Sequence, residues 1–149
     1  MLKNIHASHT NKHNLLSLLP PILLALIIFV FSSFPAEGSD AQSGFIVKII
    51  TDISPSLSNI HFLTTLVRKS AHFTEYTLLG FFTARAFSAY GKSPFLSIPV
   101  SIAYAITDEL HQLFVPGRSC ELADILLDSV GISFGTVIYI FSTKLHHKH

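Results

Sequence analysis

Charged residues are scarce in this chain of 149 residues. They make up 13% of the sequence, whereas soluble proteins carry about 25%, and hydrophobic residues make up 49%. This composition is typical of a membrane protein. The formal net charge is only +1, so the chain lacks the excess of basic residues that would favour a nucleic-acid partner.

Cysteine is limited to a single residue, Cys120. One thiol excludes an internal disulfide and a CxxC redox or metal motif, although it could still pair between two chains. The sequence also contains no internal repeat. Secondary transporters are commonly built from such repeats, so this absence weakens a transporter interpretation for a monomer.

Long apolar runs, by contrast, are abundant. Four of them predict transmembrane helices, at residues 15–34, 70–89, 95–115 and 122–141, because a helix of about 20 residues crosses a hydrocarbon core of about 30 Å. The first run exceeds the apolar core of a signal peptide, about 7–15 residues, which favours a membrane span over a cleaved leader. Residues 45–53 are too short to span and carry Lys48 and Asp52, which predicts an interfacial helix.

We therefore predict an all-α fold, an integral membrane four-helix bundle with an interfacial helix between helices one and two. Four spans place both termini on one side, and the excess of Lys and Arg on that side favours cytoplasmic termini. The expected cytoplasmic set is Lys3, Lys12, Arg85, Lys92, Lys144 and Lys148, against Lys48, Arg68, Lys69 and Arg118 outside. The expected domains are a cytoplasmic tail at 1–14, a transmembrane domain at 15–142 and a cytoplasmic tail at 143–149.

Acidic residues are concentrated where they are least expected. Most of them lie in or at the edge of the apolar stretches, namely Glu75, Asp108, Glu109, Glu121, Asp124 and Asp128. A carboxylate near the bilayer centre costs roughly 2.5–3.5 kcal/mol on insertion scales, so such groups usually face a bundle interior and serve a function. Glu75, Asp108 and Asp128 each lie roughly 9–12 Å below the expected outer surface, at about 1.5 Å rise per residue. We therefore expect one outward-facing polar pocket.

Helical spacing places further polar side chains beside these acids. On the second predicted helix and its entrance, Arg68, His72 and Glu75 share one face. On the third, Asp108 and Gln112 share a face and His111 flanks it. On the fourth, Asp124 and Asp128 share a face. Glu109 points about 100° away from Asp108 and is expected to meet a different partner. On the last helix, Gly131 and Gly135 form a GxxxG surface that lets another helix approach closely.

These residue types suit several kinds of chemistry. Carboxylates and imidazoles can act as general acids and bases, or they can bind a divalent metal. Metal binding at His72 or His111 is less favoured, because the sequence has neither a HExxH motif nor a Cys/His cluster. Arg68 and Arg118 at the rim suit a lipid phosphate, and Arg118 could hold it bidentately. The structural alternative is that the polar groups only fasten the helices together.

Three segments resemble the VanZ-like family of small membrane proteins, which is named for a protein associated with resistance to teicoplanin. They are RKSAHFTEY at 68–76 with Leu79-Gly80, DELHQ at 108–112 with Phe114 and Pro116-Gly117-Arg118, and Asp124 with Asp128, Gly131 and Gly135. The resemblance implies an integral membrane protein of a bacterial envelope and points to a contribution to glycopeptide tolerance. It implies no particular reaction, substrate or cofactor. Relatives often carry Asn where this chain has Asp128, and the added charge favours a proton-sharing pair with Asp124.

The leading hypothesis is that the pocket binds or modifies an envelope lipid or a glycopeptide-related molecule at the plasma membrane. The expected catalytic residues are Glu75, Asp108, His72, His111 and Asp128. The expected substrate-binding residues are Arg68, Arg118, Gln112 and Asp124. The alternatives are a proton-coupled carrier and a non-enzymatic helix-packing accessory subunit. Membrane lipids are expected partners, whereas the sequence specifies no cofactor, metal or oligomeric state.

Overall fold

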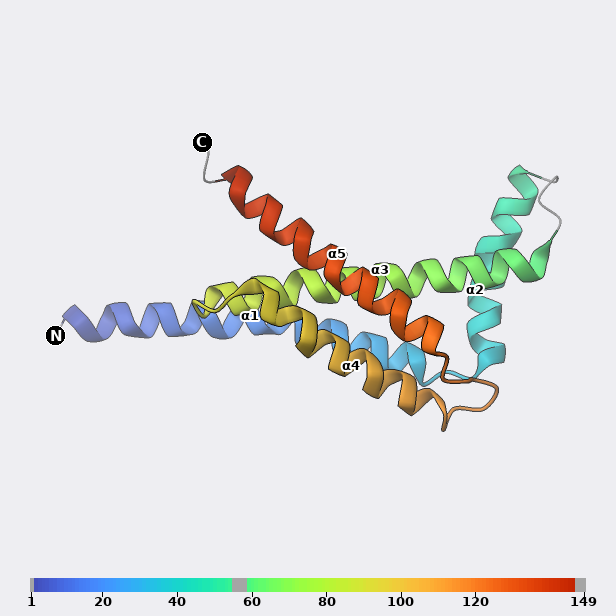
Figure 1. Ribbon diagram of the computed structural model, residues 1–149, viewed down its shortest axis with the longest axis horizontal. Coiled ribbons are helices and arrows are strands. Elements are labelled where there is room, and N and C mark those ends of the chain that lie inside the picture. Colours follow the sequence, from blue (N-terminus) through green and yellow to red (C-terminus); the bar gives the residue numbers. More distant parts are fainter. Residues whose placement is uncertain (1, 55–58, 147–149) are drawn as a thin grey trace.

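The computed structural model describes the backbone of residues 2–54 and 59–146, which is helical and contains no strand (Figure 1). The elements are α1 (Leu2–Ser32), α2 (Ala36–Ile53), α3 (Ile60–Ala89), the 3-10 turn η1 (Pro94–Leu96), α4 (Ser97–Gln112) and α5 (Leu122–His146). The start of α1 and the end of α5 lie at one end of the molecule, and α2 lies at the other (Figure 1). The predicted all-α class is confirmed.

Two described helices are long and apolar enough to cross a membrane, at Asn14–Ser32 within α1 and Leu122–Leu145 within α5. They correspond to the first and last predicted spans. The second predicted span lies within α3 and the third within η1 and α4.

Helix boundaries differ from the prediction at several places, and α3 begins at Ile60, ten residues before the predicted second span. Helix α1 already begins at Leu2, so the backbone of the predicted tail at 1–14 is helical from that residue, while its side chains before Asn14 lie outside the described part. Helix α4 ends at Gln112, because the next three N–H groups each bond to the carbonyl three residues back. Helix α5 continues to His146, and residues 147–149 of the predicted C-terminal tail lie outside the described residues.

Helix α3 is central and packs against α1, α2, α4 and α5. Its closest neighbour is α5, because glycines let the two backbones meet. A Cβ atom on Gly135 would lie 2.8 Å from the Thr77 carbonyl carbon, and one on Gly131 would lie 2.8 Å from the Phe73 carbonyl oxygen. From the α3 side, a Cβ on Gly80 would lie 2.8 Å from the Cα of Ile132. The predicted close-approach surface on the last helix is confirmed.

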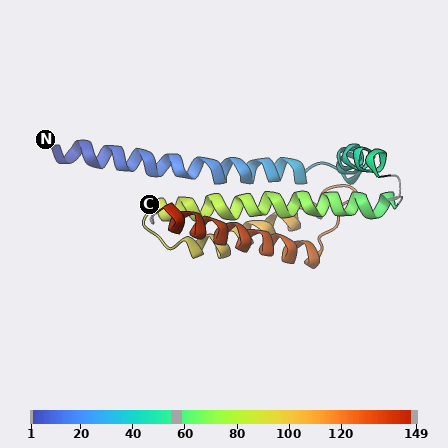
Figure 2. The ribbon, with the colours of Figure 1, turned by 90° about the horizontal axis from the view of Figure 1, so that it is seen from above.

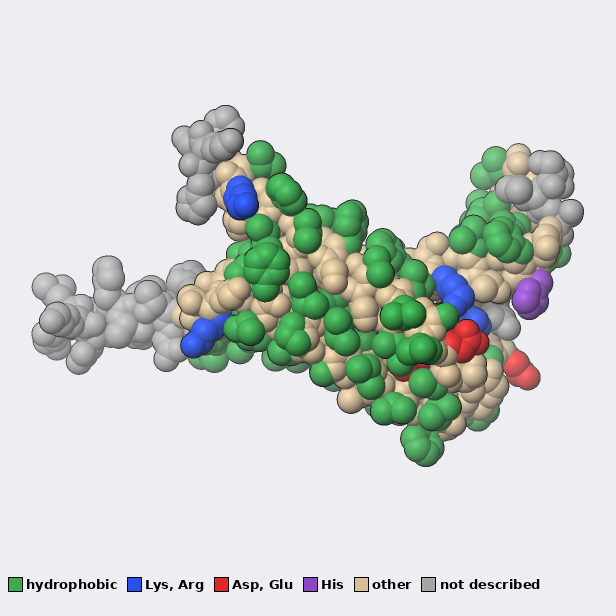
Figure 3. All heavy atoms as spheres, in the orientation of Figure 1, with side chains coloured by type: hydrophobic (Ala, Val, Ile, Leu, Met, Phe, Trp, Pro, Cys, Tyr) green, Lys and Arg blue, Asp and Glu red, His purple; other side chains and the backbone are tan. Residues whose placement is uncertain are grey.

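Several acidic side chains of α4 and α5 are buried, while many large apolar side chains are exposed. Asp108, Glu109 and Asp128 are at most 2% exposed, whereas Leu15 on α1 is 60% exposed and Phe141 on α5 is 61% exposed. Hydrophobic side chains accordingly cover much of the face seen in Figure 3. This arrangement is typical of a protein whose surroundings are lipid, since a lipid-facing charge is costly and a lipid-facing Leu or Phe is not.

Helix α2 lies crosswise to the other helices, which run lengthwise in Figure 2 while α2 is seen nearly end-on. Its first N–H, on Ala36, donates to the Pro116 carbonyl at 3.2 Å, which ties it to the loop between α4 and α5. Val47 is buried, whereas Phe45 is 68% exposed and Ile53 is 79% exposed. The predicted short helix is confirmed, and it begins nine residues before the apolar run because the polar segment from Ala36 is also helical.

We predict that Gly135→Ala lowers the stability of the protein by about 1–3 kcal/mol, since an added methyl group overpacks a backbone contact that has no flexible neighbour to move. The measurement is thermal unfolding of the purified protein in detergent. Gly44→Ala in α2 is the matched control, because no atom lies within 4 Å of its Cβ position and alanine favours a helix. Equal melting temperatures for the two variants would contradict the packing described here.

Candidate functional site

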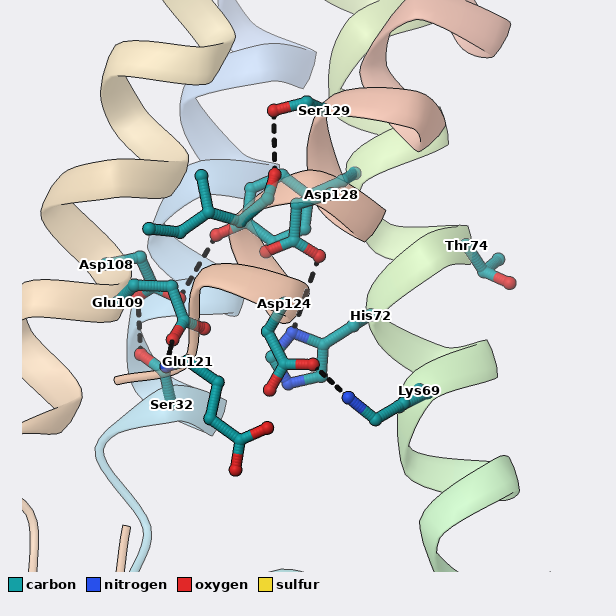
Figure 4. Close-up of polar contacts among 12 residues, drawn as sticks. Ser32, Lys69, His72, Thr74, Asp108, Glu109, Glu121, Asp124, Asp128 and Ser129 are labelled. Atoms are coloured by element: carbon teal, nitrogen blue, oxygen red, sulfur yellow. Dashed lines mark hydrogen bonds and ion pairs between the residues drawn. The ribbon is translucent and has the colours of Figure 1, made fainter. Parts of the chain in front are cut away.

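A cluster of polar side chains from α1, α3, α4 and α5, with buried acidic residues at its centre, lies toward the end of α1 (Figure 4). Asp108 of α4 joins three of these helices. Its carboxylate accepts a hydrogen bond from the Ser32 hydroxyl at 2.6 Å and one from the Tyr76 hydroxyl at 3.1 Å. The Gln112 amide nitrogen lies 3.5 Å away as a further donor. Asp108 is therefore buried with both carboxylate oxygens in hydrogen bonds.

His72 of α3 and Asp128 of α5 face one another, with the His72 Nδ1 atom 3.8 Å from an Asp128 carboxylate oxygen (Figure 4). Asp128 is fully buried. Neither of its oxygens, nor the His72 Nδ1 atom, has a hydrogen-bond partner among the described residues. A buried carboxylate without a donor is costly, so this pair differs sharply from the satisfied Asp108.

Asp124, one turn before Asp128, forms an ion pair with Lys69 of α3 (Figure 4). The sequence favoured a proton-sharing pair between Asp124 and Asp128. The structure instead places each aspartate opposite a different residue of α3, because residues 69 and 72 lie on consecutive turns of the helix that packs against α5. Asp124 therefore lies in the site as expected, with a lysine as its partner.

Glu109 lies in the same site, although the sequence analysis left it out of the candidate residues. It is 1% exposed. Its carboxylate accepts a hydrogen bond from the Gln112 side-chain amide at 3.0 Å and one from the backbone N–H of Glu121 at 3.4 Å. A ligand atom of Glu109 lies within 4.8 Å of ligand atoms on His72 and Asp128. Consecutive residues of a helix point about 100° apart, so Glu109 faces a different side of α4 from Asp108 and lies near Asp128 of α5. Helix α4 packs against α1, α3 and α5, which buries both side chains.

Two cavities adjoin the buried residues. The larger, about 250 Å³, lies between α1, α2 and α3 and is lined by Ile28, Phe31, Ser32, Ser43, Ile46, Val67, Arg68, Ala71, His72, Glu75 and Arg118. The smaller, about 100 Å³, is lined by Arg68, Lys69, His72, Gln112, Gly117, Arg118, Ser119, Glu121 and Asp124. Arg68, His72 and Arg118 line both cavities, whereas Asp108 and Asp128 line neither.

Arg118 anchors the loop between α4 and α5 to the end of α1. Its guanidinium donates to the carbonyls of Phe31 and Phe34 at 3.3 and 2.9 Å, and to the Gln112 side-chain oxygen at 3.2 Å. The last carbonyls of a helix have no partner within the helix, so a guanidinium satisfies them well. Gly117 makes the preceding turn with φ of 76°, a conformation that suits glycine. Arg118 therefore shapes the site as well as lining it.

His111, like Asp108 and Asp128, lines neither cavity, but it lies against an apolar residue of α1. Its ring packs against Phe29 of α1, with ring centroids 4.5 Å apart. Its Nδ1 atom is buried and has no hydrogen-bond partner among the described residues. Every other candidate residue either lines one of the two cavities or contacts a residue that does.

A family model described as VanZ/LLP1 matches residues 17–143, a range that includes the whole site, and it confirms the resemblance seen in the sequence. No curated protein and no solved structure matches the chain. The match and the two long apolar helices together indicate a membrane protein.

We predict that Asp108→Leu lowers stability by about 1–3 kcal/mol, because it leaves the buried Ser32 and Tyr76 hydroxyls without their acceptor. Asp108→Asn should lose much less, since its amide can still accept from one hydroxyl and donate to the other. Abundance in the membrane and thermal unfolding in detergent measure both effects. Thr107→Leu, at the exposed neighbouring position, is the control; a loss there as large as in Asp108→Leu would refute the buried network.

Proposed function

Since the chain belongs to the VanZ/LLP1 family, we propose that it is a multi-pass protein of a bacterial plasma membrane whose polar site binds or modifies an anionic envelope lipid. In this proposal α1, α3, α4 and α5 form a four-helix membrane bundle with cytoplasmic termini. Helix α2 lies along the outer interface. Its crosswise orientation and its position at the end of the molecule opposite the start of α1 and the end of α5 support this placement (Figures 1 and 2).

The observation that carries the proposal is the mixed lining of the larger cavity. Arg68 and His72 on α3 supply the basic and hydrogen-bonding side, and Phe31 of α1 and Ile46 of α2 supply an apolar side. A lipid with an anionic headgroup requires both kinds of surface, because its phosphate needs a cationic donor and its chains need apolar contacts. A small water-soluble anion would need only the first.

Glu75 is the acidic residue that lines this cavity, and His72 lies one helical turn before it. We assign Glu75 the role of general acid and base, because a half-buried carboxylate beside the ligand can exchange a proton with it. Asp108 does not line the cavity, but it accepts hydrogen bonds from the Ser32 and Tyr76 hydroxyls. We therefore assign it the role of a positioning residue that holds these two side chains. Gln112 and Asp124 line the smaller cavity together with Arg68.

The proposed orientation predicts that Cys120, which is partly exposed near the start of α5, reacts with a membrane-impermeant maleimide added to intact cells. Cys120→Ser should abolish labelling. In that background, Ser93→Cys in the exposed turn before η1 should be labelled only after the cells are permeabilised. Labelling of Ser93→Cys in intact cells, together with no labelling of Cys120 in the unaltered protein, would reverse the orientation and place the cavity on the cytoplasmic side.

The lipid proposal predicts that Arg68→Gln weakens binding of phosphatidylglycerol about tenfold relative to phosphatidylcholine, because a charge-assisted hydrogen bond contributes about 1.5–3 kcal/mol. Native mass spectrometry of the protein released from nanodiscs measures this selectivity. Arg85→Gln is the matched control, since Arg85 is exposed on the same helix and lines neither cavity. Equal selectivity in the two variants would remove the support for a headgroup site at Arg68.

If the protein modifies the lipid, Glu75→Gln should block the reaction. The unmodified envelope lipid should then accumulate in this strain as it does in a deletion strain, while the variant protein remains at normal abundance. Comparative lipidomics and sensitivity to teicoplanin are the two measurements. An unchanged lipid profile in both strains would exclude modification. In that case unaltered teicoplanin sensitivity would favour the accessory-subunit alternative.

A further inference from the structure

We propose that His72, Glu109 and Asp128 form a binding site for one divalent transition-metal cation of the Zn²⁺ or Mn²⁺ class. This site does not depend on the lipid proposal. The three residues come from α3, α4 and α5, and one ligand atom from each lies within 4.8 Å of the others. Ligand atoms around Zn²⁺ lie about 3.4 Å apart when each is about 2.1 Å from the metal in a tetrahedral arrangement. Small side-chain rotations would therefore bring the three into coordination.

The unpartnered atoms at this position point to a cation. Asp128 is fully buried, and both of its oxygens lack a hydrogen-bond donor among the described residues. The buried Nδ1 atom of His72 also lacks a partner and lies 3.8 Å from one of these oxygens. A buried carboxylate normally pairs with a donor, takes up a proton or coordinates a metal. No hydrogen-bond donor among the described residues reaches Asp128, and a cation between Asp128 and His72 would satisfy both side chains.

Local charge leads to the same conclusion. The site holds the carboxylates of Glu75, Asp108, Glu109, Asp124 and Asp128 and the basic side chains of Arg68, Lys69 and Arg118. Counted by formal charge, with neutral histidine and without the exposed Glu121, these groups have an excess of two negative charges when every carboxyl group is ionised, as metal binding requires. One divalent cation has the opposite charge of equal size. Lys69 cannot supply this balance for Asp128, because it is paired with Asp124.

The surroundings of the three residues resemble those of a metal site in two further respects. Metal-binding carboxylates are usually oriented by hydrogen bonds from outside the coordination sphere. Glu109 has such donors in the Gln112 amide and the backbone N–H of Glu121. In addition, His72 lines both cavities, so an ion could enter from the polar rim. One imidazole and two carboxylates are borderline-hard ligands, which suit Zn²⁺ and Mn²⁺.

The test uses the full chain, purified in detergent through a tag without histidine. His146, His147 and His149 are replaced by alanine in a parallel background, because a histidine-rich tail can bind Zn²⁺ by itself. Elemental analysis should find about one Zn²⁺ or Mn²⁺ per chain in both backgrounds. After chelation, adding back the ion at saturating concentration should raise the melting temperature by about 5 °C, because the ion binds only the folded state.

Asp128→Asn should abolish both the bound ion and the melting shift. Without metal, this variant should melt no lower than the wild type, because it lacks the unpaired buried charge; loss of binding is then separable from misfolding. His111→Gln is the matched control, since His111 also has an unpartnered buried Nδ1 atom but lies outside the cluster, and it should bind normally. The absence of any shift with either ion, or equal loss in the two variants, would overturn the proposal.

Discussion

The contact between α3 and α5 determines where the functional groups of this protein meet. Gly131 and Gly135 bring the α5 backbone against the α3 backbone. No larger side chain fits there without a shift of the helices. Because the helices are this close, the short side chain of Asp128 lies 3.8 Å from His72. The same approach lets Asp124 reach Lys69. A wider helix separation would move these acids away from Lys69 and His72.

The second constraint is that one carboxylate holds three helices. Asp108 of α4 accepts hydrogen bonds from Ser32 of α1 and Tyr76 of α3. Arg118 adds a tether from the following loop to the end of α1. These satisfied contacts form a fixed frame beside the cavities. Glu75, in the cavity wall, and Asp128, with no donor, are the groups with capacity for further interactions.

Much of the fold was predictable from the sequence, because the length of an apolar run and the spacing of polar residues on a helix are local properties. The helical class, the close-approach surface at Gly131 and Gly135 and the grouping of Arg68, His72 and Glu75 all follow from such local patterns. Family membership also followed, since the motif order at 68–136 needs no structure to be seen, and the family model confirms it.

Only the tertiary structure decided which polar groups pair. Helical phase places Glu109 about 100° from Asp108, but it does not reveal that α4 is packed on both of those sides, so Glu109 was left out. It likewise could not show that Asp124 pairs with Lys69, or that His111 packs against Phe29. The sequence by itself determined the helices and the faces on which charge lies, because these depend on neighbours along the chain. Partners across helices depend on how the helices rotate and approach one another, which the packing of the whole bundle determines.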